Sequence, residues 1–156
     1  MPSGRKGGLR PDRASGVAMF EAIFASALRA LPVFLLHLGV TLAILALGVL
    51  IYMWVTPHQE TRLVREGNVA AATSFGSAVV GLALPLAICL SRSVNVADIV
   101  IWGIVALVVQ LVTFFVMGLV FKDLSRRIEN GDMAAAVALA ATKVSVAAVN
   151  AAAIAG

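Results

Sequence analysis

Residues 62–72 read RLVREGNVAAA, and residues 126–136 read RRIENGDMAAA. In this register an arginine, a glycine and three consecutive alanines coincide, and Asn68 falls on Asp132. Each copy lies between two long apolar runs, so the repeating unit is a helix, a polar loop and a second helix. Internal repeats of this kind are the sequence signature of many membrane proteins. The repeat therefore predicts the architecture of the whole chain.

The composition of the chain indicates a membrane protein. Of its 156 residues 61% are hydrophobic and 13% are charged, with a mean hydropathy of +1.00. Soluble domains carry roughly 25% charged residues. The apolar residues form four blocks of about 20 residues or more, which is the length of a membrane-crossing helix. We therefore expect an all-α integral membrane protein with four transmembrane helices.

Four regions follow along the chain. Residues 1–16 are rich in glycine, proline and arginine, which predicts a disordered basic tail. Residues 17–30 have apolar side chains at helical spacing, which fits either an interfacial amphipathic helix or the first turns of a longer span. Residues 31–90 and 91–156 are the two predicted two-span repeats.

The number of spans in each repeat fixes the relation between the repeats. Two crossings return the chain to its starting side, so the second repeat enters the membrane in the same direction as the first and the repeats are parallel. Near the spans, five basic residues lie in the two repeat loops and three on the other side, which favours cytoplasmic loops. These residues are Arg62, Arg65, Lys122, Arg126 and Arg127 against Arg13, Arg29 and Arg92. The distal Arg5, Lys6 and Arg10 would reverse the count.

The loop motif also resembles a known family. The first copy contains E-G-N-x-A-A-A at 66–72, followed by G-x-A-x-P at 81–85, and the second copy departs from it at Asp132. This pattern resembles the bacterial domain-of-unknown-function family 350, over residues 31–156. The carriers in the second half are residues 126–132, 134–136 and 150–152. The resemblance implies a four-span inner-membrane protein and supplies no established activity.

Four polar residues inside the predicted spans are candidates for function, because polar groups are costly in lipid. Lys143 and Gln110 fall at similar depth, so the glutamine carbonyl could accept from the ammonium. His37 and Asn150 fall in one leaflet, and Asn150 shares a helix face with Lys143. The four could line one polar track. The alternative is that each forms an isolated helix–helix hydrogen bond.

The two repeat loops are the second candidate site. Gly67 and Gly131 suit tight turns, and Asn68 and Asp132 suit N-caps of the following helices. The alternative is an anion or headgroup site at the two helix N-termini, assisted by nearby arginines. The residues of the two motifs are Arg65, Glu66, Gly67, Asn68, Arg126, Arg127, Glu129, Gly131 and Asp132.

Small residues predict which helices pack together. The second span carries Ala72, Gly76, Ser77 and Gly81, and the fourth span is mostly alanine. Small residues let helices approach closely in lipid. We therefore expect spans two and four to pack, spans one and three to face lipid, and several copies to assemble.

Signals for enzymatic chemistry are missing from the sequence. His37 and His58 have no companions at metal-ligand spacing, and Cys89 is the single cysteine. No nucleophile with a base and no phosphate-binding glycine loop occurs. The basic residues lack aromatic interleaving, which argues against nucleic acid. We expect no enzyme activity, no cofactor and no metal.

Two functions remain open. One is an oligomerising membrane scaffold, or a stress or sensor component, that recruits protein partners through the two loops. The other is a channel or transporter for an ion or small solute, with Lys143, Gln110, Asn150 and His37 along its path.

Overall fold

A computed structural model describes residues 13–55 and 60–156, with side chains from residue 16 onward. The predicted tail therefore lies outside the described residues as far as residue 12, as do Pro57 and His58. The described residues form six helices and no strand. They are α1 (Arg13–Val55), α2 (Glu60–Arg65), α3 (Val69–Arg92), α4 (Val96–Val120), α5 (Lys122–Glu129) and α6 (Met133–Ala155).

The chain divides into two units, 1–35 and 36–156, which we describe separately. In the first unit the described residues belong to α1, which continues through Pro32. The interfacial position predicted for residues 17–30 remains a prediction. The second unit holds the end of α1 and the other five helices, and it contains all the sites described below.

Within residues 13–55 and 60–156, four helices are long and apolar enough to cross a membrane. They cover Gly16–Val55, Val69–Arg92, Val96–Val120 and Met133–Ala155. This confirms the prediction of an all-α membrane protein with four spans. The polar loops predicted between the spans contain two short helices, α2 and α5.

The two repeat loops have the same backbone geometry. Gly67 and Gly131 have φ values of +85° and +84°, in the left-handed region where a side chain is strained. In the first loop the N–H of Gly67 donates to Val64 and that of Asn68 donates to Leu63, the paired bonds of a Schellman C-cap. In the second loop the N–H of Gly131 donates to Ile128 and that of Asp132 donates to Arg127 in the same way. This likeness is local, and the tandem repeat as a whole remains a prediction.

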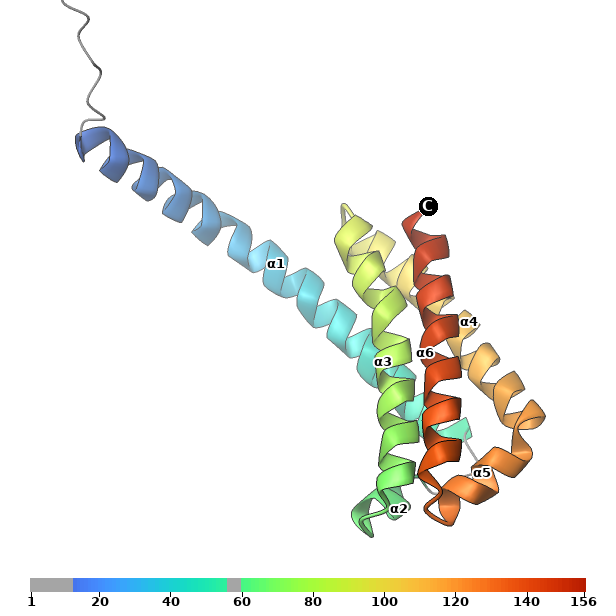
Figure 1. Ribbon diagram of the computed structural model, residues 1–156. Helices are drawn as coiled ribbons and strands as arrows, with labels where there is room; N and C mark the ends of the chain where they lie inside the picture. The colour runs from blue at the N-terminus through green and yellow to red at the C-terminus, as the bar shows by residue number, and fades with distance from the viewer. Residues whose placement is uncertain (1–12, 56–59) are drawn as a thin grey trace, which may run out of the picture. The chain divides into compact units, whose positions relative to one another are not determined.

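The α3 and α6 helices form the most extensive helix–helix contact of the second unit, and they lie side by side in Figure 1. Small residues make this approach possible: Ala71, Ala78, Ala136 and Ala147 are buried. A Cβ atom added to Gly81 would lie 3.5 Å from the Cβ of Ala147. Spans two and four therefore pack as the small residues predict.

Larger side chains complete the core of this unit. Around α3, one cluster includes Tyr52, Leu82, Phe114 and Leu139. A second cluster joins α1, α3 and α4 through Ile44, Leu86, Ile99 and Leu107. On the faces of α1 and α4 that point away from these clusters, large apolar residues remain exposed, as is expected for helices that meet lipid.

Candidate functional site

The ammonium of Lys143 lies at the centre of a buried polar network between α1, α2, α3 and α6. Its Nζ atom donates to the Tyr52 hydroxyl at 3.0 Å, the Ser74 hydroxyl at 3.0 Å and the Ser74 carbonyl at 3.3 Å. An ammonium has three N–H groups, so these acceptors use its full donor capacity. The side chain is only 4% exposed.

The carboxylate of Glu60, the first residue of α2, balances this charge. Its Oε2 atom accepts from the Tyr52 hydroxyl and its Oε1 atom accepts from the Ser74 hydroxyl, each at 3.0 Å. The same two hydroxyls therefore accept from the ammonium and donate to the carboxylate. A buried charge pair is tolerable when both groups are hydrogen-bonded, and here the ammonium uses all three donors while each carboxylate oxygen accepts one bond.

Aromatic rings enclose the ammonium as well. Its Nζ atom lies 5.3 Å from the Tyr52 ring centroid and 5.7 Å from the Phe114 ring centroid, within cation–π range. A cavity of about 40 Å³ borders Glu60, Tyr52, Phe114 and Lys143. That volume is sufficient for a water molecule beside the network.

A second polar pair lies further along the bundle. The Asn150 amide donates to Gln110 Oε1 at 3.4 Å and to the Ala106 carbonyl at 3.5 Å. The predicted bond from Lys143 to Gln110 is therefore wrong, because each residue has other partners. Glu60 also lies near the ammonium, because Tyr52 and Ser74 bond to both groups.

Phe114 lies close to both polar groups. Its ring approaches the Lys143 ammonium on one side, and its Cζ atom would lie 2.8 Å from a Cβ added to Gly81. The Gln110 Nε2 atom would lie 3.5 Å from the same added Cβ atom. The aromatic ring thus lies close to both the lysine network and Gln110.

His37 takes part in neither group in the contacts of the described residues. It is half-buried, and its backbone carbonyl accepts from Thr41. In the described part of the chain, His37 Nε2 and Gln110 Nε2 are buried atoms that have no hydrogen-bond partner. The structure therefore brings together two of the four predicted track residues, Gln110 and Asn150.

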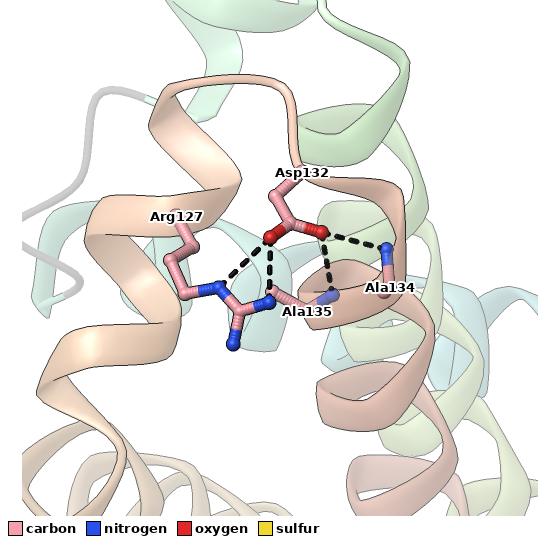
Figure 2. Close-up of polar contacts among 4 residues, drawn as sticks. All are labelled: Arg127, Asp132, Ala134 and Ala135. Carbon is pink, nitrogen blue, oxygen red and sulfur yellow. Dashed lines mark hydrogen bonds and ion pairs between the residues drawn. The ribbon is translucent and has the colours of Figure 1, made fainter.

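The repeat loops place their caps as the sequence predicts. The Asn68 side chain accepts from the Ala71 N–H at 2.9 Å. The Asp132 side chain accepts from the N–H groups of Ala134 and Ala135, and Figure 2 shows this cap together with Arg127. The Asn68 amide also donates to the carbonyls of Ile128 and Glu129, which ties the first loop to the second.

Arg127 pairs with the capping aspartate. Its Nε and an NH₂ group lie 2.8 and 2.7 Å from Asp132 Oδ2. The hydrogen bond from Ala135, followed by that from Arg127, lowers the pKa of Asp132 below its ordinary value of 3.8. The carboxylate occupies the N-terminus of α6 and neutralises Arg127, so an external anion at this helix end, the alternative raised above, has no support.

The remaining loop residues lie at the surface. Arg62 pairs with Glu66 at 3.6 Å across one turn of α2. Arg65, Arg126 and Glu129 are exposed. The side chains of Arg65 and Arg126 are therefore accessible at the surface of the loops.

The four predicted packing residues of α3 divide into two pairs. Ser77 and Gly81 are buried, and Ser77 donates to the Ser74 carbonyl at 2.7 Å. Ala72 and Gly76 are exposed in the single chain, and a Cβ added to Gly76 would meet nothing within 4 Å. Close packing inside the chain thus involves the first pair, and the second pair lies on the outer face.

A model of the family described as "Domain of Unknown Function (DUF350)" matches residues 25–154, which is most of the chain. The chain belongs to the DUF350 family. This confirms the resemblance carried by the loop motifs. The DUF350 match extends from within α1 almost to the end of α6, so it covers all four spans.

Two curated relatives of this DUF350 chain are inner-membrane proteins. UPF0719 inner membrane protein YjfL of Escherichia coli K12 is 36% identical over 98 residues, which are 63% of this chain and 73% of the relative. The protein of the same name in Escherichia coli O157:H7 matches equally. No solved structure matches. With its four apolar spans, the chain is a multi-pass inner-membrane protein.

Three members of the lysine network were missed by sequence reasoning. Tyr52 lies near the end of the first span, Glu60 in the following loop and Ser74 in the second span, and no motif singled out any of the three. No sequence spacing links them, because they come from three different helices. The one indication in the sequence was Lys143 itself, because a lysine inside a span needs acceptors nearby.

Proposed function

We propose that the chain is a non-enzymatic membrane scaffold that assembles from several copies and presents its two loops to protein partners. The observation that carries this proposal is the outer face of α6. Small residues recur there at spacings of three and four, and all are exposed in the single chain. They are Ala134, Ala138, Ala141, Ser145, Ala148 and Ala152.

The outer face of α4 has the opposite character. Its exposed residues are large, and they include Ile101, Val108, Val112 and Phe115. Large apolar side chains mix well with lipid, whereas small residues favour close contact between helices, where packing and not hydrophobicity drives association. The face of α6 therefore suits a second helix, and Gly76 and Ala72 extend a similar surface onto α3.

The loops supply a surface on which partners could bind. The bonds from Asn68 to Ile128 and Glu129, at 3.2 and 3.0 Å, hold both loops together at one end of the unit. Arg65 and Arg126 are exposed there. We place this end in the cytoplasm, following the distribution of basic residues near the spans.

Assembly is tested by counting the subunits of labelled protein in lipid bilayers by single-molecule photobleaching. Ala141→Leu introduces a large side chain that prevents close approach at the proposed contact. Val108→Leu is the matched control on the exposed face of α4. We expect several subunits for the wild type and the control, and a shift towards one subunit for Ala141→Leu. A monomeric wild type, or an unchanged Ala141→Leu distribution, would contradict the proposal.

Partner recruitment needs a separate test. Arg65→Glu and Arg126→Glu reverse the charges of the loop surface and leave the spans intact. We expect both to abolish co-purification of partners while membrane insertion and subunit number are retained. Retained co-purification would exclude the loops as the partner surface.

A second candidate function is permeation of an ion or small solute. The observation in its favour is the pair of buried nitrogens without partners in the described chain, Gln110 Nε2 and His37 Nε2. Buried polar atoms are usually satisfied, by water if not by protein. Against it, Lys143 uses all three of its donors on Tyr52 and Ser74, and Gln110 is not among its partners. Flux from liposomes tests this function, as described in the Discussion.

A further inference from the structure

A groove opens beside the lysine network at the end of the unit where the loops lie. Its volume is about 510 Å³, within the range of small-molecule sites. Apolar walls come from the end of α1 and from the last turns of α4, and α5 closes one end. The apolar wall includes Val55, Leu111, Phe115 and Leu119.

The charged residues of the groove all come from α5. Lys122 and Arg126, one turn apart, provide two positive charges, and Asp123 provides one negative charge. Both cationic side chains are exposed. The neighbouring Arg127 is paired with Asp132 and does not line the groove. An occupant therefore meets a net positive charge at one end and apolar surface elsewhere.

The position of these groups along the helices matches the layers of a bilayer. The apolar wall from Leu111 to Leu119 covers nine residues of α4, or about 12 Å of helix from the first to the last. The α4 span ends at Val120, and Lys122 begins the next helix. The cations are thus placed where a span leaves the hydrocarbon, at the depth of lipid phosphates, and the apolar wall extends inward from them.

We propose that this groove binds an anionic phospholipid, with one acyl chain along the α4 wall and the phosphate between Lys122 and Arg126. Basic pockets at the ends of transmembrane helices are suited to anionic headgroups. Tyr52, which lines the groove, also accepts a hydrogen bond from Lys143. A bound chain would therefore pack against a member of the buried network. The lipid site does not depend on the scaffold function proposed above.

Native mass spectrometry of the full chain, solubilised in detergent, tests this site. Phosphatidylglycerol and phosphatidylcholine with identical acyl chains are titrated separately, and the lipid adducts of the monomer are quantified. Because each peak has its own subunit number, lipid binding is measured whether or not the protein assembles. We expect phosphatidylglycerol to bind more tightly.

Charge variants test the headgroup site. Lys122→Gln and Arg126→Gln should each weaken phosphatidylglycerol binding about five-fold, the effect expected for one basic residue near an anionic lipid. Binding of phosphatidylcholine should change little. Arg62→Gln removes the same charge from an exposed position outside the groove and is the matched control.

A glycine tests the chain-binding wall. Gly118 lines the groove, and a Cβ added there meets nothing within 4 Å, so Gly118→Leu fills the groove without a clash at its first carbon. Gly118→Leu should therefore abolish the phosphatidylglycerol adduct. Gly39→Leu, at another helical glycine with open space, should not. Glycerol phosphate, which has the charge but no acyl chain, should compete poorly.

Three results would overturn the proposal. The first is equal binding of the two lipids by the wild type. The second is a preference for phosphatidylglycerol that survives Lys122→Gln, Arg126→Gln and Gly118→Leu. The third is effective competition by glycerol phosphate, which would indicate a site for free phosphate and not for lipid.

Discussion

The charge of Lys143 is stabilised by groups drawn from several parts of the chain. Ser74 lies in α3, Tyr52 near the end of α1, and Glu60 at the start of α2. Each hydroxyl accepts from the ammonium and donates to the carboxylate, so the network has a consistent direction of hydrogen bonding. Removing one charge would leave the other buried without its counter-charge, which is more costly than removing both.

This arrangement predicts coupling between the two charged residues. Lys143→Met and Glu60→Gln should each lower the free energy of unfolding by about 3 kcal/mol. The double variant should lose clearly less than the sum, because neither charge is then left alone. Unfolding in mixed micelles measures all four proteins of this double-mutant cycle. Additive losses would show that the two groups do not form one network.

At the scale of helices, the packing of α4 against α3 depends on the absence of a side chain at Gly81. A Cβ atom there would lie 2.8 Å from the ring of Phe114. Five residues away on the same helix, Gly76 faces open space. The two glycines therefore form a natural pair for comparison.

We expect Gly81→Ala to destabilise the protein by about 1–3 kcal/mol, because overpacking forces Phe114 to shift. Gly76→Ala should be neutral or stabilising by about 0.5–1 kcal/mol, since alanine is the better residue in a helix interior. Unfolding free energies of the two variants provide the test. Equal effects would show that Gly81 is not at a close contact.

The start of α6 should respond to pH. The pKa of Asp132 is lowered in the folded protein by the Ala135 hydrogen bond and by Arg127. Its contribution to stability is therefore complete above the ordinary pKa of 3.8 and is lost as pH falls through the lower, folded value.

Asparagine can also cap a helix, as Asn68 does at α3, but it does not titrate. Asp132→Asn should thus lower the unfolding midpoint at neutral pH and have a shrinking effect as the pH falls below about 4. Thermal unfolding of both proteins across this range measures the difference. A difference that does not vary with pH would contradict a role for the carboxylate charge.

At the scale of the molecule, scaffold and permeation make opposite predictions for Lys143. The permeation hypothesis places the lysine in the path of an ion. The structure instead gives it three acceptors and a nearby carboxylate, with Phe114 beyond. We therefore expect purified protein in liposomes to show no ion flux above that of empty liposomes, and Lys143→Ala to leave flux unchanged.

The flux comparison needs matched reconstitution, with the subunit number checked for each protein. Gln110→Leu provides a second comparison, because it removes one of the buried nitrogens without a partner. Flux that changes in magnitude or ion selectivity with Lys143→Ala would overturn the scaffold proposal. It would make the lysine network part of a conduction path.

The class of the protein and the polar loops between its spans follow from the sequence alone. Apolar blocks of the required length, the glycines of the loops and the capping residues Asn68 and Asp132 act through local physics, so they can be read in order along the chain. The small residues Ser77 and Gly81 also indicated where α3 would meet another helix.

The pairing of the polar groups, in contrast, could not be predicted before the helices were packed together. Lys143 and Gln110 fall at similar depth, yet the lysine side chain reaches Ser74 and Tyr52 while Gln110 binds Asn150. Depth along a span follows from residue number, whereas direction around it depends on how each helix is rotated against its neighbours. That rotation is fixed by side-chain packing between distant segments, and so Glu60 could not be linked to Lys143 from the sequence alone.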